Sequence, residues 1–313
     1  MQGEFELIES IRSMFPSPTG VHGIGDDCAV IPQNGEYETL VSTDMLAEGI
    51  HFILDEITPY QLGWKSAAVN FSDIAAMGGE PAGSFLAVSL PINLPENWIA
   101  GFLKGYKTIS DLYGFPLLGG DTTSSSSGVN ICVTVLGRVK KGRSLKRSGA
   151  EPGDLICVSG SVGDSAAGLK ALLEKMPRSV DVEYLVEKHY LPRPRMKEGT
   201  ALAASEGVHS MMDVSDGIGS DIRHILKESD AGAIIDVNRL PLSRQLRTFC
   251  DSCGLSPYDF ALNGGEDYEL LFTVSPQSEP ALSVPHTVIG EITSEPGLVW
   301  EGSDKDYIGF RHF

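Results

Sequence analysis

The sequence predicts an α/β or α+β protein of two domains, in which helices and sheets pack in two layers. Segments typical of helices and of strands alternate in both halves of the chain, and 313 residues are enough for two separate cores. Between the halves, residues 140–153 are basic, interrupted by Gly and Pro, and poor in apolar side chains. We therefore place the domain boundary in this segment, with one domain over 1–146 and the other over 147–313.

The first half begins with an amphipathic helix near residues 5–15, where apolar side chains recur at helical spacing. Thr58-Pro59-Tyr60-Gln61 is a capping box with proline at the first helical position, and it opens a long helix that ends at the glycine pair 78–79. A further helix is predicted over 94–114. Runs rich in β-branched and aromatic residues predict strands over 37–43, 84–90, 115–118 and 129–139.

The second half alternates in the same way. The predicted strands are 154–159, 208–214, 232–237, 268–274 and 287–292. The predicted helices are 164–175, 182–190, 196–206 and 217–229. We expect the hydroxyls of Ser159 and Ser161 and the Gly163-Asp164 turn to cap the helix that starts at 164, rather than to contact substrate. Cys250 and Cys253 form a CxxC pair, but no second pair or nearby His completes a zinc site, so we interpret them as thiols at a helix end.

The charge balance restricts the class of partner. The chain carries 24 Lys and Arg against 42 Asp and Glu, a formal net charge of −18. Such a chain repels nucleic acids and anionic lipids, and its expected charged partners are metal cations or anions that metals bring in. No apolar run reaches the roughly 18 residues of a membrane helix, and the first residues show no secretory pattern. A cytoplasmic protein without nucleic-acid or membrane partners is the expectation.

The chain has none of the common nucleotide or hydrolase motifs: GxxxxGK[ST], GxGxxG, HExxH and GxSxG are all absent. What recurs instead is a carboxylate beside Gly or Ser near a predicted strand end or helix start. The instances are Asp26-Asp27, Asp44, Asp73, Asp121, Asp213 with Asp216, and Glu266-Asp267. Each alone is equally typical of a turn, but together they supply the hard oxygen donors that suit Mg²⁺.

Asp73 is the most informative of these acids. It lies in the middle of a predicted helix whose other residues are small or apolar, on the same face as Asn70 and Met77. An acid in such surroundings is costly unless cations or hydrogen-bond donors meet it. A buried Asp that bonds to the backbone is the alternative; a metal ligand is the interpretation we favour.

The following segments together resemble the thiamine-monophosphate kinase family of the aminoimidazole-ribonucleotide-synthetase-like superfamily: 24–31 (IGDDCAVI), 42–52 (STDMLAEGIHF), 68–81 (AVNFSDIAAMGGEP), 117–123 (LLGGDTT), 147–154 (RSGAEPGD), 159–169 (SGSVGDSAAGL), 213–222 (DVSDGIGSDI), 263–273 (NGGEDYELLFT) and 309–313 (GFRHF). The resemblance implies transfer of the ATP γ-phosphoryl group to thiamine monophosphate, giving thiamine diphosphate and ADP with several Mg²⁺ ions. It also implies a homodimer whose N-terminal sheets pair into a shared barrel, with the C-terminal α/β domain alongside.

The same resemblance assigns site residues, each at a matching position of this sequence. The implied metal ligands are Asp26, Asp27, Ser42, Thr43, Asp44, Asp73, Asp121, Asp213 and Asp216, of which Asp44, Asp73 and Asp121 are expected to be catalytic. The implied nucleotide contacts are Gly120, Asp121, Arg147 and Ser215. The implied substrate contacts are His51, Glu266 and either Tyr307 or Phe310.

Several alternatives stay open at this point. Arg147 could be a solvated boundary residue rather than a phosphate ligand, and His51 could be structural. Glu266 could pair with the thiazolium cation or accept a hydrogen bond from the pyrimidine amine. The serine run 124–127 is expected to be a mobile loop.

Two other functions compete with the kinase. One is ATP-dependent activation of an amide oxygen, with the same acidic apparatus but a different acceptor pocket. The other is a non-catalytic buffer of divalent metal, although EF-hand spacing is missing from the sequence.

Overall fold

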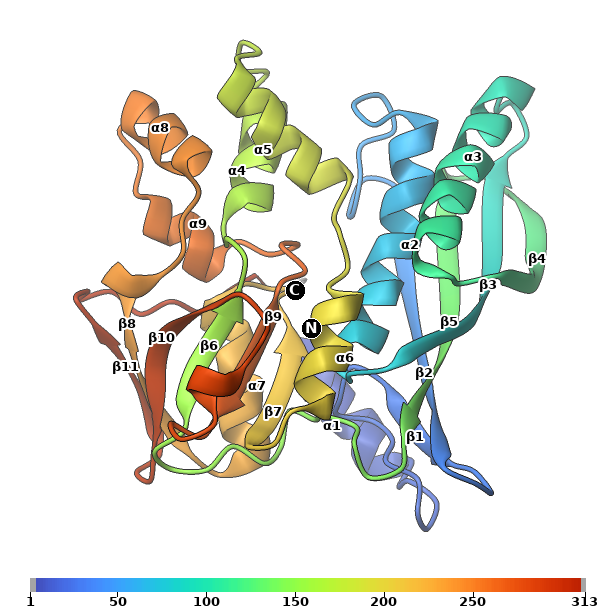
Figure 1. The fold of residues 1–313 in the computed structure, drawn as a ribbon. Helices are drawn as coiled ribbons and strands as arrows, with labels where there is room; N and C mark the ends of the chain where they lie inside the picture. The colour runs from blue at the N-terminus through green and yellow to red at the C-terminus, as the bar shows by residue number, and fades with distance from the viewer. Residues whose placement is uncertain (1–3, 311–313) are drawn as a thin grey trace.

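The computed structural model describes residues 4–310 and folds them into two α/β domains, each built around one sheet (Figure 1). The N-terminal sheet has the order β1-β2-β5-β3-β4 and the C-terminal sheet the order β11-β8-β10-β6-β9-β7. The predicted fold class is confirmed. The N-terminal sheet is open in the single chain, with β1 and β4 at its two edges.

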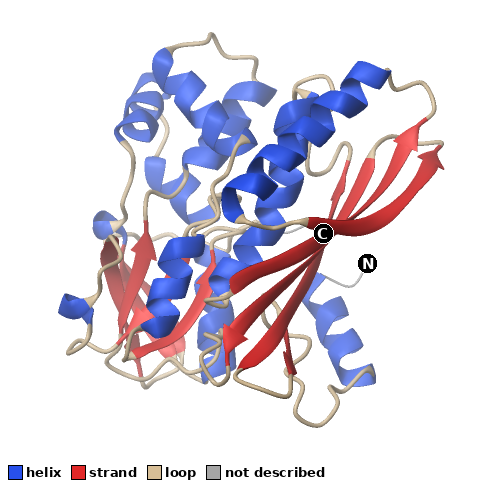
Figure 2. Cartoon of the chain, turned by 45° about the vertical axis from the view of Figure 1, so that its right-hand side comes forward, coloured by secondary structure: helices blue, strands red, loops and turns tan. Residues whose placement is uncertain are grey.

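The N-terminal domain contains three helices and five strands among the described residues. In chain order they are α1 (Glu4–Met14), β1 (Ala29–Pro32), β2 (Tyr37–Ala47), α2 (Pro59–Ala76), β3 (Glu80–Pro91), α3 (Glu96–Tyr113), β4 (Leu117–Ser125) and β5 (Asn130–Lys140). Helices α2 and α3 cover one face of the sheet, and no helix of the described chain covers the other (Figure 2). One face of this sheet is therefore a core and the other is exposed.

Helix α2 forms where the sequence predicts it. The Thr58 side chain accepts from the Gln61 backbone, and the Gln61 side chain accepts from the Thr58 backbone, so the capping box is confirmed. Two glycines let α2 and α3 approach closely: a Cβ at Gly63 would lie 2.0 Å from the Phe102 carbonyl oxygen, and one at Gly105 would lie 1.9 Å from that of Tyr60. This close crossing buries nearly the whole length of α2.

Side-chain alternation along β2 separates the two faces of the N-terminal sheet. Leu40 and Leu46 are buried on the face toward α2, whereas Met45 is 59% exposed on the opposite face. Asp44 shares the inner face, and Thr43 shares the outer face with Met45. Thr43 and Asp44 are adjacent in the sequence, yet their side chains therefore lie on opposite faces of the sheet.

The C-terminal domain contains the remaining strands and helices. The strands are β6 (Leu155–Ser159), β7 (Val208–Asp213), β8 (Gly232–Asp236), β9 (Leu270–Val274), β10 (His286–Thr293) and β11 (Gly297–Glu301). The helices are α4 (Asp164–Leu173), α5 (Val180–Tyr190), α6 (Met196–Ala204), α7 (Ile218–Ser229), α8 (Arg244–Cys253) and α9 (Pro257–Asn263), with short 3-10 turns at Val237–Arg239 and Glu279–Ala281. Figure 1 shows α4, α5, α8 and α9 gathered at one end of the sheet.

Helix α2 also joins the two domains. Trp64 donates its indole N–H to the carbonyl of Pro192 at 2.8 Å, and Tyr190 donates its hydroxyl to the carbonyl of Glu56 at 2.8 Å. A Cβ at Gly199 of α6 would lie 2.1 Å from the carbonyl oxygen of Ala75. The C-terminal domain is therefore packed directly onto the helix that carries Asp73.

Two local predictions are wrong in part. Ser124 and Ser125 belong to β4, which continues its pairing with β3 as far as Pro91, so half of the serine run is strand rather than loop. Helix α4 begins at the predicted turn, with Gly163 as its N-cap, but Ser159 and Ser161 do not cap it, because the backbone N–H groups of Gly163 and Ser165 donate to Asp267. A distant acid does the capping that two nearby hydroxyls were expected to do.

Other elements were missed or stay untested. β1, β11 and α9 have no counterpart among the predicted elements, because they are too short to show a period. Helix α8 was predicted only at its end, through Cys250 and Cys253. Cys250 and Cys253 are free thiols in the last turn of α8. The boundary at 146/147 stays a prediction. None of the described helices is both long and apolar enough to cross a bilayer.

Candidate active site

Four aspartates from four distant segments form a cluster where α2 meets the two sheets. We call Asp27, Asp44, Asp73 and Asp213 the acidic cluster. Asp27 precedes β1, Asp44 lies on the inner face of β2, Asp73 on α2 and Asp213 at the end of β7. Each of them except Asp44 has its pKa raised by repulsion from other members, which requires that the carboxylates lie close together. Tertiary structure thus unites acids that are as far apart as 186 positions in the chain.

Hydroxyl and amide groups hold the cluster in place. Ser42 donates to Asp73 Oδ2 at 2.6 Å, and Ser72 donates to Asp213 Oδ2. The side-chain carbonyl of Asn70 accepts from the Asp44 backbone N–H at 3.0 Å. The two hydroxyl donors orient the carboxylates of Asp73 and Asp213 without neutralising their charge, and Asn70 fixes the Asp44 backbone.

Burial and mutual repulsion make the ionised acidic cluster unfavourable in the protein alone. Burial, followed by repulsion from Asp44 and Asp213, raises the pKa of Asp73 well above its ordinary value. Burial and then Asp27 raise the pKa of Asp213 to about 8. Burial also raises the pKa of Asp44. A group of carboxylates in this state binds either protons or cations.

Among residues 4–310, Arg147 is the one cationic side chain that forms an ion pair with a member of the acidic cluster. Its guanidinium grips Asp27 Oδ1 through Nη2 and Nε, and its backbone N–H donates to Asp26 Oδ1 at 2.8 Å. His22 Nε2 lies 2.7 Å from the other oxygen of Asp26. Burial still raises the pKa of Asp27 to about 6 against the pull of Arg147. Arg147 is therefore half-buried between the domains, rather than a solvated boundary residue.

The chemistry of these donors fits Mg²⁺. The buried Asp27 Oδ2 has no hydrogen-bond partner among residues 4–310, and an orphaned carboxylate oxygen is a ready ligand for a cation. Within the same residues, no three His, Cys, Asp or Glu side chains already converge closely enough to hold one ion. Carboxylates that do not enclose an ion by themselves are compatible with Mg²⁺, which commonly binds one or two carboxylates and completes its coordination shell with water and substrate phosphates.

Three predicted residues lie away from the acidic cluster, on the outer face or outer edge of the N-terminal sheet. Thr43 Oγ1 bonds to Thr134 at 3.0 Å on the exposed face, while Gly120 and Asp121 lie on the exposed edge strand β4. Since β5 and β3 separate β2 from β4, Asp121 lies on the order of 14 Å from Asp44 at about 4.8 Å per strand. One chain therefore does not bring Asp121 to the same ion as Asp44.

The predicted substrate contact Glu266 lies in a second ionic group. Lys65 Nζ lies 2.8 Å from Glu266 Oε1 and 3.0 Å from Oε2, and His189 Nδ1 lies 3.2 Å from Oε2. We call Lys65, His189 and Glu266 the lysine cluster. Burial opposes ionisation of Glu266, but Lys65 and then His189 outweigh it and lower the pKa of that carboxyl. His51 is close enough to contribute in the same direction, and its Nδ1 accepts from the Ala47 backbone at 3.0 Å.

Lys65 is a site residue that the sequence patterns did not single out. It is fully buried in α2, eight positions before Asp73 and in the same run of small and apolar residues. The reason that selects Asp73, a charge within an apolar helix, applies equally to Lys65. Its partner Glu266 lies 201 positions away, so the pairing itself could not be read from the sequence.

The remaining predicted residues lie along the loop after β7 and at the C-terminal end of the described chain. The Ser215 carbonyl accepts from the Glu266 N–H at 2.7 Å, and the Asp216 carbonyl accepts from the Phe310 N–H at 2.9 Å. Tyr307 is buried in the C-terminal core with its hydroxyl 3.0 Å from Ser303, whereas Phe310 is 49% exposed. Residues 311–313 of the GFRHF motif lie outside the described residues.

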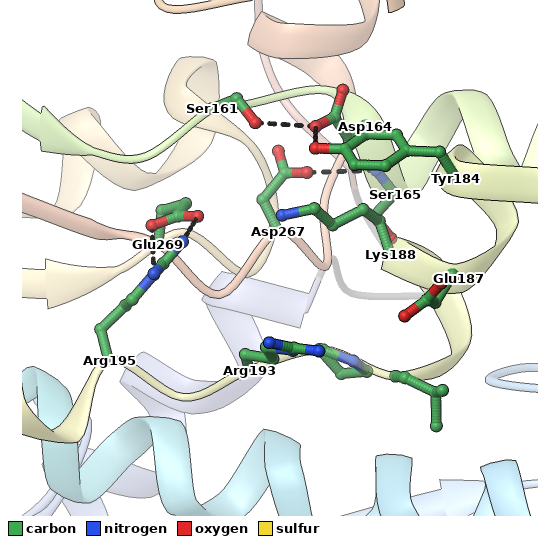
Figure 3. Close-up of a pocket in the computed structure, with 12 residues that line it drawn as sticks. Ser161, Asp164, Ser165, Tyr184, Glu187, Lys188, Arg193, Arg195, Asp267 and Glu269 are labelled. Atoms are coloured by element: carbon green, nitrogen blue, oxygen red, sulfur yellow. Dashed lines mark hydrogen bonds and ion pairs between the residues drawn. The ribbon is translucent and has the colours of Figure 1, made fainter. Parts of the chain in front are cut away.

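A separate cavity of about 340 Å³ lies in the C-terminal domain (Figure 3). Asp267 and Lys188 contribute opposite charges to its wall, and Arg195 there forms a bidentate ion pair with Glu269. Ser165, which also lines it, hydrogen-bonds His189 at 3.1 Å. Within this cavity Glu269 is paired with Arg195 and Asp267 accepts from the N-terminus of α4, while Lys188 lies over the Tyr184 ring.

Fold and site together define the class of protein. The chain matches AIR synthase related protein in two parts, the N-terminal domain over residues 25–139 and the C-terminal domain over residues 151–301. Within that class, the thiamine-monophosphate kinase of Escherichia coli K12 is 40% identical over 330 residues, which cover 99% of this chain and 98% of the relative. That of Bacillus subtilis 168 is 36% identical over 92% of this chain and 91% of the relative. The chain belongs to the thiamine-monophosphate kinase family.

Solved structures agree. A structure described as AaThiL complexed with AMPPCP and TMP has a TM-score of 0.91 and 34% identity, over 99% of this chain and 97% of that one. The thiamine-monophosphate kinase of Stenotrophomonas maltophilia K279a has a TM-score of 0.80 and 36% identity, over 96% and 98% of the two chains. A HypE–HypF complex, at 17% identity and a TM-score of 0.73, shares the fold alone.

Proposed function

We propose that this protein phosphorylates thiamine monophosphate with ATP, giving thiamine diphosphate and ADP. The acidic cluster is the observation that carries the proposal, because buried like charges at a domain junction suit a reaction between two polyanions held by divalent cations. The relative described as complexed with AMPPCP and TMP supports the same pair of ligands. An ATP-dependent reaction and five free cysteines favour the cytoplasm as the place of action.

The acceptor needs little chemical activation. A phosphate monoester carries about −1.5 to −2 charges at neutral pH, since its second pKa is near 6. Its attacking oxygen is already largely deprotonated, and a general base is unnecessary. The described acidic cluster contains no His that would act as one. The barrier is chiefly the mutual repulsion of the two anions and their alignment in line.

The chain's own residues address that repulsion. Asp27, Asp44, Asp73 and Asp213 would hold the Mg²⁺ ions, with Ser42, Asp26 and Asp216 nearby to complete or orient the set. Bound Mg²⁺ supplies positive charge to the phosphate oxygens. Arg147 is held by Asp27 so that its charge lies beside the same phosphates, and Ser215 lies on the loop that would face the nucleotide.

A homodimer accounts for the residues that one chain keeps apart. Asp121 and Gly120 lie on an exposed edge strand, and the outer face of this sheet carries exposed apolar side chains such as Met45 and Phe85. Pairing of two such faces would bury those side chains and carry Asp121 of one copy toward the acidic cluster of the other. We therefore propose that each active site takes Asp121, and with it the Gly120 contact, from the second copy.

The thiamine moiety would lie between His51, Glu266 and the end of the chain. Phe310 is the better aromatic candidate, because it is exposed and its backbone is tied to Asp216, while Tyr307 is buried with its hydroxyl engaged. Exposed aromatic rings stack readily on a flat heterocycle.

A coupled assay of ADP release tests the proposal. Thiamine monophosphate, thiamine and an amide precursor of a purine ring are offered separately, each with ATP and Mg²⁺. We expect turnover with thiamine monophosphate alone. Turnover with the amide would replace the proposal by ATP-dependent amide activation, and metal uptake without any turnover would favour a metal buffer.

A further inference from the structure

Lys65 is buried against the proposed substrate contact. Its side chain is 1% exposed, and Nζ reaches both carboxylate oxygens of Glu266 at 2.8 and 3.0 Å. The Glu266 side chain is 27% exposed. Full burial of a lysine is costly without a partner, so the charge of Lys65 depends on Glu266, and only the Glu266 edge of the pair faces solvent.

His189 completes the pair as a neutral donor. Burial, followed by the charge of Lys65, lowers the pKa of His189 to about 3. Its Nε2 lies 3.4 Å from Lys65 Nζ, which can only donate, so Nε2 is the acceptor and Nδ1 carries the hydrogen. Nδ1 lies 3.1 Å from Ser165 Oγ and 3.2 Å from Glu266 Oε2, so its hydrogen faces both oxygens.

The backbone of Glu266 needs this support. Its φ is +63°, and that of Tyr268 is +52°, in the left-handed region that residues other than glycine seldom occupy. Such conformations persist only where the surroundings enforce them, and they concentrate at ligand sites. The Glu266 N–H donates to Ser215 at 2.7 Å, which fixes the main chain, and Lys65 with His189 fixes the side chain.

Contacts within the protein occupy part of the hydrogen-bond accepting capacity of the Glu266 carboxylate. A carboxylate offers about four acceptor positions, of which Lys65 takes one on each oxygen, while the Nδ1–H of His189 lies between Oε2 and Ser165. At least one acceptor position is left, on a carboxylate whose charge is matched by Lys65. A matched charge attracts a cation weakly, but a free lone pair still accepts a hydrogen bond.

We propose that Lys65 is a positioning and specificity residue, which makes Glu266 a neutralised hydrogen-bond acceptor for the exocyclic amine of the aminopyrimidine rather than a counter-ion for the thiazolium. This inference rests on the proposed function, since it concerns how that substrate is recognised. It assigns the pyrimidine end of thiamine monophosphate to the lysine cluster and leaves the phosphate end for the acidic cluster.

The test compares Lys65→Met with Lys65→Arg, using thiamine monophosphate and its analogue in which the exocyclic amine is replaced by oxygen. In the wild type we expect kcat/KM to be about 100-fold lower for the analogue, since a site built to accept an N–H donor rejects a ligand without it. Lys65→Met should raise KM for thiamine monophosphate about 10-fold or more and shrink the discrimination to a few-fold, with kcat changed much less. Lys65→Arg, which keeps the charge and two donors, should restore most of both.

A double variant, Lys65→Met with Glu266→Gln, covers the case in which the single variant does not fold, because it leaves no unpaired buried charge. It too should lose the discrimination, while its Kd for ATP stays within about two-fold of the wild type. Discrimination and KM that survive in Lys65→Met, or discrimination that survives in the double variant, overturn the role of Lys65. Absence of any turnover of thiamine monophosphate by the wild type instead overturns the proposed function, and the inference with it.

Discussion

The acidic cluster and the lysine cluster both include a residue of α2, but they differ in whether their charges are balanced within the protein. Asp73 and Lys65 are eight residues apart, about 12 Å along the helix axis, and each meets residues of the C-terminal domain. The acidic cluster collects four carboxylates whose pKa values are raised, foremost by burial. In the lysine cluster, Lys65 and Glu266 match one another and His189 is neutral.

The difference separates two kinds of recognition on one helix. In our proposal, cations complete the acidic cluster, so its occupancy would be tied to the phosphates that arrive with them. The lysine cluster is complete, and it offers a fixed polar surface to an uncharged group. Reactions between anions need the first kind of site, and selection of a particular acceptor needs the second.

Asp73→Asn breaks the acidic cluster and should have the largest effect. The amide keeps the shape but loses the charge that would hold Mg²⁺, so we expect kcat to fall about 10²- to 10³-fold. The measurement is ADP release at saturating substrates. Asp111→Asn is the matched control, because Asp111 forms only an exposed pair with Lys107. Wild-type turnover in Asp73→Asn would remove Asp73 from the mechanism.

Mixing two inactive variants tests whether the acidic cluster is completed by a second copy. Asp73→Asn and Asp121→Asn should each be nearly inactive alone, since each removes a carboxylate from every site. Co-expressed in equal amounts, they should recover about a quarter of wild-type activity, because half of the dimers are mixed and each has one intact site of two. No recovery, with mixed dimers confirmed by tag purification, would mean that Asp121 acts within its own chain or not at all.

The stability of the metal-free protein should fall as pH rises. The pKa of Asp213 is about 8 in the folded protein against about 3.9 when unfolded, so the folded state binds more protons between these values. Unfolding free energy therefore decreases from about pH 4 to pH 8 on account of this group. After chelation, we expect Tm to drop by several degrees between pH 6 and pH 8, about what a few kcal/mol produces.

Added Mg²⁺ sharpens the same measurement. Because it binds the ionised carboxylates, it should raise Tm more at pH 8 than at pH 6. Asp213→Asn should flatten the pH dependence and reduce the response to Mg²⁺. An equal response at both pH values would contradict a cluster that exchanges protons for metal.

His51→Ala probes the surroundings of the lysine cluster and should have the smallest effect. His51 lies near Glu266 and bonds the Ala47 backbone, so its loss removes one contact to the substrate. We expect KM for thiamine monophosphate to rise about 10-fold, which corresponds to about 1.4 kcal/mol, while Kd for ATP is unchanged. An unchanged KM would leave His51 with a structural role.

Local signals in the sequence specified most of the elements. The capping box at Thr58 and the terminal Gly114 placed α2 and α3 correctly, because both act within one turn of helix. Short elements such as β1 and α9 were not predicted, because a segment of only a few residues shows no hydrophobic periodicity. The serine run was taken for a loop, but backbone pairing to β3 extends β4 to Ser125 whatever the side chains are.

The residue types alone predicted that this protein gathers acids for a metal-dependent reaction, and the motifs determined its family. Only the tertiary structure decided which acids meet. Neighbouring residues of a strand face opposite ways, so the adjacent Thr43 and Asp44 lie on opposite faces of the sheet. Asp27 and Asp213, by contrast, come together from different domains. It also decided that Glu266 faces a buried lysine, a pairing that no pattern of spacing along the chain encodes.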